Sequence, residues 1–290
     1  MSDTPEHRPC PGPSPTSPAP TAARTAARTA ARTAASADAG LPPGLHLQGP
    51  VATLSLRRPA QANRLSLSDV DTLIGQVAEV NTQHGVRVLQ LRSEGRHFCS
   101  GFDLNQVGEA GAAAVARFEA LAKALEDARP VTVAAIQGGA YGGGVDLALA
   151  CDFRLGTTAC QMAIPASKLG LHFYRGGMER LVSRLGLGVA KRLLLAAHTL
   201  DADALQACGL LDSAVPPDAL PDELQRWTDE LCARAPLALL PMKQHLNAIA
   251  RHRLDEATLQ EDMARAAASQ DLQEGSRAWA EKRVPVFRGR

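Results

Sequence analysis

Apolar residues from position 45 onward fall into strand-length runs and helix-spaced faces, and the clearest run spans residues 131–136. This segment is uncharged and mostly β-branched, which predicts a buried strand. Five glycines follow within residues 138–144, so the strand should end in a tight turn. Residues 145–151 are rich in Ala and Leu with Asp146 near their start, which predicts a short buried helix.

The same alternation recurs on both sides of this segment. Short apolar runs predict a hairpin and further strands at residues 45–48, 51–56, 86–91, 152–156 and 161–164. A helix should begin after a cap at Ser66 or Ser68. Later helical patterns span residues 176–185, 189–197, 202–208, 223–233, 237–250 and 256–268. These units imply an α/β domain over residues 41–235, followed by a helical region over residues 236–290.

Residues 1–40 differ in composition from the rest of the chain, because a Pro-rich stretch precedes a four-residue repeat of Thr, Ala and Arg. Such a segment has too little apolar surface to offset the entropy of ordering, so we expect a disordered arm. Its arginines resemble those of a transit peptide, but Asp3, Glu6 and the prolines argue against that interpretation. The sequence has no run of about 18 apolar residues, so we expect no transmembrane helix and no membrane partner.

The composition describes a globular chain without a strong electrostatic bias. Its 290 residues, 45% hydrophobic and 21% charged, are enough for one large domain. The net charge of +1 favours neither nucleic acid nor a membrane surface as a partner. Six cysteines lie without Cys-x-x-Cys spacing, which favours a reducing cytoplasm over a disulfide framework. His and acidic residues also lack metal-ligand spacing, so we expect no metal site.

The glycine turn is the first candidate for chemistry. Three consecutive glycines at residues 142–144 let the backbone approach a ligand and leave amide groups free to donate to negative charge. The alternative is that they only permit tight packing of a strand against a helix. A phosphate loop is not indicated, because no Gly-Lys-Ser/Thr follows.

Five blocks follow one another along the chain: Leu56-Arg57-Arg58-Pro59, residues 98–104, residues 142–152, residues 165–181 and Glu281-Lys282-Arg283. Their order and spacing resemble the crotonase, or enoyl-CoA hydratase/isomerase, superfamily over residues 45–290. The resemblance implies an α/β fold, a spiral of ββα units with a C-terminal helical oligomerisation region. It also implies an acyl-CoA substrate that brings its own coenzyme A, no permanently bound cofactor, and a homotrimer or dimer of trimers.

The resemblance assigns roles to single residues. It implies that the amides of Ser100 and Gly143 form an oxyanion hole, which would hold the enolate oxygen of a thioester. Asp146 stands where a hydratase of this family has its first glutamate, and Ala166 stands where it has the second. Because Ala166 can carry no proton, the two-glutamate mechanism does not carry over, and Asp146 and Tyr174 are the catalytic candidates.

The remaining implied contacts are with the acyl group and coenzyme A. They are Arg58, Phe98, Asp103, Leu104, His172, Trp279 and Lys282. Trp279 and Lys282 match positions where the family meets adenine and phosphates, often from a neighbouring subunit; the alternative is an anchoring aromatic and a solvated lysine. For His172 the alternative is a structural hydrogen bond, and for Asp146 it is a helix cap.

Water addition to a 2-enoyl-CoA is the leading hypothesis for the reaction. The aspartate after the glycines is also found in dienoyl-CoA isomerases, which this block resembles. Those enzymes need two further carboxylates, at positions where this chain has Ala166 and Tyr174. The tail over residues 273–285 is similar to the methylmalonyl-CoA decarboxylase branch, whose loop tyrosine would fall on Phe173. A decarboxylase, a double-bond isomerase and a CoA-binding scaffold without chemistry are the alternatives.

Overall fold

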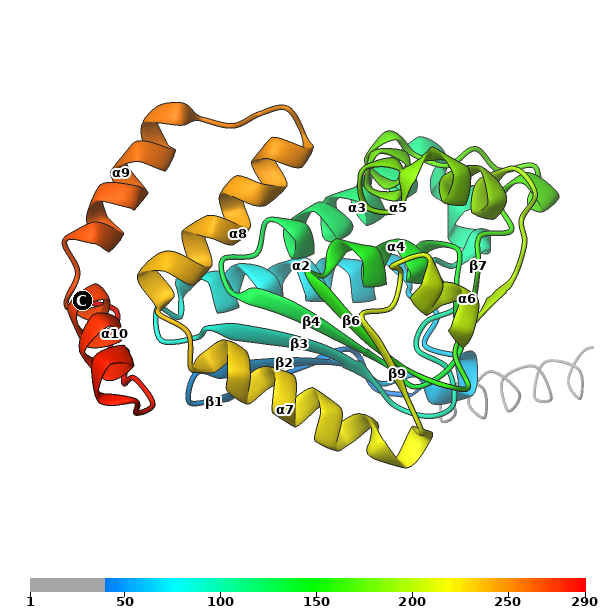
Figure 1. Cartoon of the computed structure of the whole chain (residues 1–290). Coiled ribbons are helices and arrows are strands. Elements are labelled where there is room, and N and C mark those ends of the chain that lie inside the picture. The colour runs from blue at the N-terminus through cyan, green and yellow to red at the C-terminus, as the bar shows by residue number, and fades with distance from the viewer. Residues whose placement is uncertain (1–39) are drawn as a thin grey trace, which may run out of the picture. The chain divides into compact units, whose positions relative to one another are not determined.

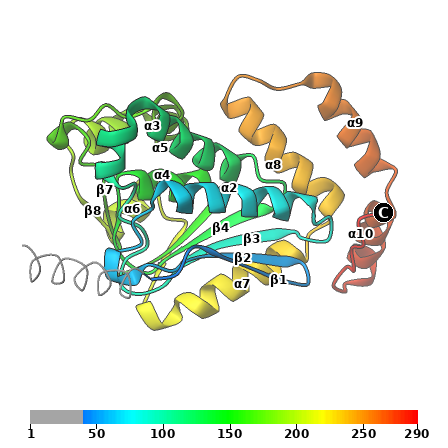
Figure 2. The ribbon, with the colours of Figure 1, turned by 180° about the vertical axis from the view of Figure 1, so that it is seen from behind.

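The computed structural model describes residues 40–290, without the side chains of residues 104–110. The expected disordered arm therefore lies outside the described residues, apart from Gly40. The described chain is a mixed α/β structure, which confirms the predicted fold class. Its helices surround one main sheet, as Figures 1 and 2 show from two sides.

The main sheet has six strands in the order β1-β2-β3-β4-β6-β9. They are β1 (Gly44–Gln48), β2 (Val51–Leu56), β3 (Val88–Ser93), β4 (Val131–Ile136), β6 (Phe153–Thr157) and β9 (Ser213–Val215). β1 and β2 form the expected antiparallel hairpin, and every other pairing in this sheet is parallel. A small second sheet joins β5 (Ala140–Tyr141), β7 (Gln161–Ala163) and β8 (Leu200–Asp201).

Helices cover both faces of the main sheet (Figure 1). One face carries α2 (Leu67–Thr82), α3 (Leu104–Glu126), α4 (Gly143–Ala150) and α5 (Arg175–Leu194), and α7 (Leu220–Cys232) covers the other. Strand β4 is buried along its whole length because it packs on both sides. Val131, Val133 and Ala135 face the cluster that contains α7, whereas Ala134 and Ile136 belong to the larger cluster under α2 to α5.

Short elements and the C-terminal helices complete the chain. These are η1 (Pro59–Gln61), η2 (Ser167–Leu169), η3 (Pro217–Ala219), α6 (Ala202–Ala207), α8 (Pro236–Ala250), α9 (Glu256–Ala267) and α10 (Gln270–Glu281). The buried Lys243 fastens α8 to the domain, because its ammonium donates to the carbonyl of Pro130 at 2.6 Å and lies 2.8 Å from Asp152. Asn247 of α8 also donates to the carbonyl of Glu126 at 3.0 Å, whereas α9 and α10 lie farther from the sheet than α8 does (Figure 1).

Several local expectations change in the structure. Ser66, not Ser68, caps α2, where it forms a capping box with Asp69. The two helices expected over residues 176–185 and 189–197 are one element, α5, with a non-helical Gly186 at φ +76° inside it. Helix α3 has no sequence-based expectation, because alanines and glycines leave few large apolar residues to mark its face.

Candidate active site

Two loops meet beside the glycine turn that follows β4. Cys99 and Ala140 form a parallel bridge, and the amide of Tyr141 donates to the carbonyl of Cys99 at 2.9 Å. This pairing brings the loop over residues 98–102 against the start of α4. Backbone atoms from two segments about 40 residues apart in sequence therefore line one side of the same site.

The glycines are required by close contacts. Gly101 has φ +93°, and a Cβ there would lie 2.8 Å from the carbonyl oxygen of Tyr141 and 3.0 Å from the amide nitrogen of Gly143. A Cβ on Gly144 would lie 2.2 Å from the carbonyl oxygen of Cys99, and one on Gly143 would lie 2.5 Å from the ring of Phe118. Tight packing, one of the two interpretations of the glycine run, is thus present, and it leaves the amides at the start of α4 exposed to the site.

Two amides at this junction have no acceptor among the described residues. Gly143 is the first residue of α4, where an amide has no partner within the helix. The second is the amide of Phe102. In the parallel bridge between Phe102 and Leu65, the hydrogen bonds are made by the residues on either side of Phe102, so the N–H of Phe102 itself points away from Leu65. Both residues line the cavity described below.

The expected donor Ser100 requires a correction. Its amide donates to the carbonyl oxygen of Ala62 at 2.9 Å, so this N–H is already occupied. Ser100 still lines the cavity. The sequence does not show which amides of this loop are used in backbone pairing. The amide of Phe102, two residues after Ser100, therefore cannot be identified as a free donor from the sequence.

An apolar cavity of about 150 Å³ opens beside these amides. The polar side chains in its described lining are Ser100, His172 and Tyr174, and none of the described lining residues is Asp, Glu, Lys or Arg. Large apolar residues and Ala166 form most of the remaining wall; they include Phe102, Val115, Phe118, Ile164, Leu171 and Phe173. The cavity can therefore hold an uncharged acyl group against two amide donors.

Asp146 does not belong to the described lining, because its side chain is fully buried behind Tyr174. The Tyr174 hydroxyl donates to Oδ2 of Asp146 at 2.5 Å. The guanidinium of Arg180 donates through Nε to Oδ1 at 2.8 Å and through Nη2 to Oδ2 at 2.7 Å. Burial and then the charge of Asp146 raise the pKa of Tyr174 well above its ordinary value, so its hydroxyl keeps its proton.

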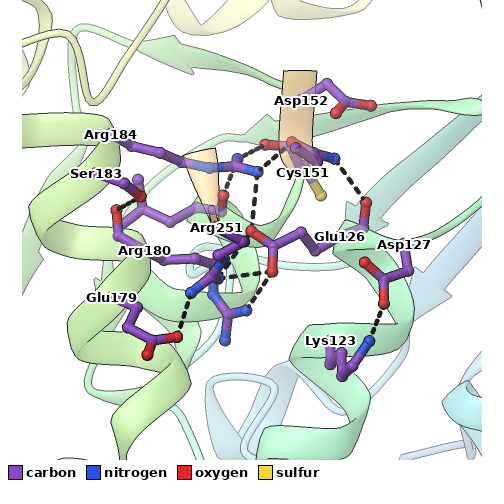
Figure 3. A network of polar contacts seen from close by, with 12 residues as sticks. Lys123, Glu126, Asp127, Cys151, Asp152, Glu179, Arg180, Ser183, Arg184 and Arg251 are labelled. Carbon is purple, nitrogen blue, oxygen red and sulfur yellow. Dashed lines mark hydrogen bonds and ion pairs between the residues drawn. The ribbon is translucent and has the colours of Figure 1, made fainter. Parts of the chain in front are cut away.

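The pair of Asp146 and Arg180 continues into a buried network, part of which Figure 3 shows. Arg180 also donates to Glu126 at 2.9 Å, and Arg251 at the end of α8 donates to the same carboxylate at 2.7 Å. Arg251 further donates to Glu179 at 2.8 Å. Helices α3, α4, α5 and α8 are therefore tied together directly behind the cavity.

His172 lies at the cavity, as the resemblance implies, and its Nδ1 lies 2.8 Å from the carbonyl oxygen of Phe173. Arg58 instead makes a two-pronged ion pair with Asp69, at 2.9 and 3.0 Å. Phe98 has no exposed surface, so its side chain belongs to the core, and the prediction that it contacts coenzyme A is wrong for this chain.

Four other predicted contacts lie away from the cavity or outside the described side chains. Oδ1 of Asp103 lies 3.8 Å from Nη1 of Arg64, and the side chain of Leu104 lies outside the described part. Trp279 is 87% exposed on α10, with Lys282 as the residue that ends this helix. Neither residue is among the described residues that line the cavity, and α10 lies at the opposite end of the described chain from β7 (Figures 1 and 2).

No three or more His, Cys, Asp or Glu residues in the described part are grouped as they would be around a metal ion. Among the described helices, none has the length and apolar character needed to cross a membrane.

Comparisons with known proteins show the family of this chain. The family model for enoyl-CoA hydratase/isomerase matches residues 46–290. A 2,3-dehydroadipyl-CoA hydratase from Escherichia coli is 30% identical over 256 residues, which cover 83% of this chain and 96% of the relative. A crotonyl-CoA hydratase from Syntrophomonas wolfei is 30% identical over 244 residues, which cover 82% and 94%. The solved structure of an enoyl-CoA hydratase/carnithine racemase from Magnetospirillum magneticum has a TM-score of 0.80 at 26% identity, and the match covers 86% and 96%.

Proposed function

Because the chain belongs to the enoyl-CoA hydratase/isomerase family, we propose that its cavity adds water to a short, uncharged 2-enoyl-CoA. The protein is an acyl-CoA enzyme of the hydratase/isomerase type. The observation that carries the finer proposal is the pair of acceptor-free amides, Gly143 and Phe102, at an apolar cavity. The relative from Syntrophomonas wolfei, which is named for crotonyl-CoA, supports a short acyl group.

In this proposal the two amides hold the thioester oxygen. Attack of water at Cβ pushes electrons toward the thioester and builds negative charge on that oxygen. Fixed backbone donors stabilise the charge without the reorganisation that water would require. Because the donors are main-chain groups, they depend on the backbone path that the glycines permit and not on the side chain of Phe102.

In this proposal the hydroxyl of Tyr174 binds the water that attacks the substrate. The water oxygen forms the bond to Cβ, the carbon–carbon double bond opens, and the proton that the water loses ends on Cα. No other reactant is consumed. Tyr174 is the side chain that joins the cavity to the buried Asp146, which supports its assignment. Ser100 and His172 contact the substrate without a role in proton transfer.

The lining of the cavity argues against the decarboxylase alternative. A malonyl-type thioester carries a second carboxylate, and no described lining residue offers a cation to pair with it. Two observations still favour the scaffold alternative: Ala166 carries no proton, and Asp146 is buried and does not line the cavity. It predicts binding without turnover, which the experiment below separates from catalysis.

We also propose that the chain assembles as a homotrimer or dimer of trimers in the cytoplasm. Apolar side chains are exposed along the C-terminal helices; they include Met242, Leu246, Ile249, Met263, Leu272 and Trp279. In such an assembly Trp279 and Lys282 would reach the coenzyme A of a neighbouring subunit. Free thiols at Cys99, Cys151, Cys160, Cys208 and Cys232 support a reducing compartment.

The test is turnover of crotonyl-CoA, a 3-enoyl-CoA and methylmalonyl-CoA by the wild type and by Tyr174→Phe, followed by mass spectrometry. Gain of one water by crotonyl-CoA, greatly slowed in Tyr174→Phe, is the expected result. Conversion of only the 3-enoyl or the methylmalonyl thioester would replace hydration by isomerisation or decarboxylation. Tight binding of all three without turnover would establish the scaffold alternative.

A further inference from the structure

Both oxygens of the Asp146 carboxylate accept hydrogen bonds, from donors of two residues. Oδ1 accepts from Arg180 Nε, and Oδ2 accepts from Arg180 Nη2 and from the Tyr174 hydroxyl. The side chain has no exposed surface, so water cannot substitute for any of these donors. An aspartate in this position has neither a free lone pair directed at substrate nor a route to the cavity that bypasses Tyr174.

Arg180 makes a two-pronged ion pair with this carboxylate. Burial opposes the guanidinium charge, but the hydrogen bonds and charge of Asp146 raise the pKa of Arg180 above its ordinary value. A charged carboxylate is only an acceptor, so the proton between Tyr174 and Asp146 belongs to the tyrosine. The proton of the Tyr174 hydroxyl therefore points to Asp146, and the oxygen itself accepts no hydrogen bond from the described residues, while Tyr174 lines the cavity.

We propose that Asp146 and Arg180 are positioning residues that turn the Tyr174 proton into the core, so that Tyr174 acts on the substrate water as a hydrogen-bond acceptor. The inference deepens the proposed function and rests on it for the identity of the water. An acceptor at this place orients the water with its oxygen toward Cβ, because the water uses one of its own protons for Tyr174. Asp146 then acts through Tyr174 and never contacts substrate.

The orientation of Arg180 is fixed by the network behind it. The carboxylate of Glu126 accepts hydrogen bonds from both Arg180 and Arg251. With Arg184, Glu179 and the exposed Arg175 included, four guanidinium groups face three carboxylates, so every carboxylate of the network has a cationic partner. Such pairing lets buried charges persist and holds each side chain in one geometry.

The first experiment reads the ionisation of Tyr174 without any turnover. The chain has two tyrosines, so Tyr141→Phe leaves Tyr174 as the single reporter. Biosynthetic replacement by 3-fluorotyrosine, whose phenol is more acidic, gives one fluorine NMR signal that follows ionisation. The charged groups facing this hydroxyl are Asp146 on α4, Arg180 on α5 and Glu119 on α3.

The expected result is that Asp146→Asn in this background increases the ionisation constant of residue 174 by about tenfold or more, because a nearby negative charge and its hydrogen bond are removed. Asp152→Asn is the matched control, since Asp152 also pairs with a buried cation, Lys243, but does not contact Tyr174. If Asp146→Asn does not fold, the neutral pair Asp146→Asn/Arg180→Gln replaces it, with the same expected direction. An unchanged ionisation constant would overturn the proposal.

The second experiment is a double-mutant cycle on hydration kinetics in the wild-type background. If Asp146 acts only through Tyr174, Asp146→Asn should lower kcat with little change in KM. In the Tyr174→Phe background the same substitution should cause no further loss of kcat. If Asp146→Asn still slows Tyr174→Phe by tenfold or more, Asp146 has its own chemical role and the inference fails. If no thioester is turned over, the proposed function fails instead, and the fluorine signal alone decides the inference.

Discussion

Tyr174 reaches from the wall of the acyl cavity into the core, where its hydroxyl donates to Oδ2 of Asp146 at 2.5 Å. The two residues come from different elements: Asp146 lies in the first turn of α4, and Tyr174 precedes α5. Their contact places the tyrosine between the carboxylate and the substrate space. The side chain that we propose to contact the substrate therefore lies between the cavity and the charge of Asp146.

Ala166→Glu is expected to raise the rate of crotonyl-CoA hydration by about tenfold or more, because it places a proton-carrying group in the cavity wall. Ala166→Gln is the matched control, since it has a similar size without an exchangeable acid. Rates are measured by loss of absorbance of the conjugated thioester. Equal rates for the two variants would show that the missing carboxylate does not limit this enzyme.

Gly143→Ala is expected to lower kcat by about 10²- to 10³-fold, which is the usual loss when one oxyanion donor is displaced. Its Cβ would lie 2.5 Å from the ring of the buried Phe118, so either this ring or the backbone with its amide must shift, and we expect the amide to be displaced. Gly188→Ala is the control, since a Cβ there meets no atom within 4 Å. The two variants are compared by kcat and by circular dichroism, and a catalytically intact Gly143→Ala would contradict the assignment of this amide.

Arg180→Met is expected to reduce the free energy of unfolding by about 3–5 kcal/mol, because it leaves the buried Asp146 without a counter-charge. Urea denaturation measures this loss. Arg226→Met serves as the comparison, since its ion pairs with Glu223 and Glu230 are solvent-exposed and should contribute little. Equal losses in the two variants would mean that the Arg180 network does not stabilise the fold.

The free energy of unfolding is expected to fall as the pH rises above 9. Burial raises the pKa of Cys99 and of Cys151 from 9.0 to about 12, so these thiols ionise first in the unfolded chain. The unfolded state thus binds fewer protons between pH 9 and 12, and each thiol lowers stability by about 1.4 kcal/mol per pH unit there.

The Cys99→Ala variant tests this assignment. Its stability should be lower at neutral pH, because a buried Sγ is removed, but it should decline less steeply above pH 9 than that of the wild type. Urea titrations at a series of pH values give both slopes. Parallel curves for the two proteins would show that Cys99 does not contribute to the alkaline loss.

Leu246→Glu is expected to dissociate the proposed trimer into monomers, because Leu246 is 65% exposed among the apolar side chains of α8. Size-exclusion chromatography with light scattering reports the mass. Leu187→Glu is the control: Leu187 is 57% exposed, but on α5 and not on the C-terminal helices. A wild-type protein that is already monomeric would reject the proposed assembly.

Much of the fold could be predicted from local sequence. The β-branched run of β4, the glycines after it and the cap of α2 each act on their own neighbours, so their elements follow from periodicity and turn chemistry. Helix α3 could not be predicted in this way, because its face is made largely of alanines. It becomes a helix through packing on α2 and α4.

For the site, the sequence by itself determined which residues stand in the family's blocks: the glycine run, Asp146, Ala166 and the loop that holds Tyr174. Only the tertiary structure decided which of their groups are free. The amide of Ser100 meets Ala62, and the carboxylate of Asp146 meets Arg180, from segments 38 and 34 residues away in sequence. Whether a donor or a charge faces substrate depends on such partners, which the fold brings together across the core, and no local pattern records them.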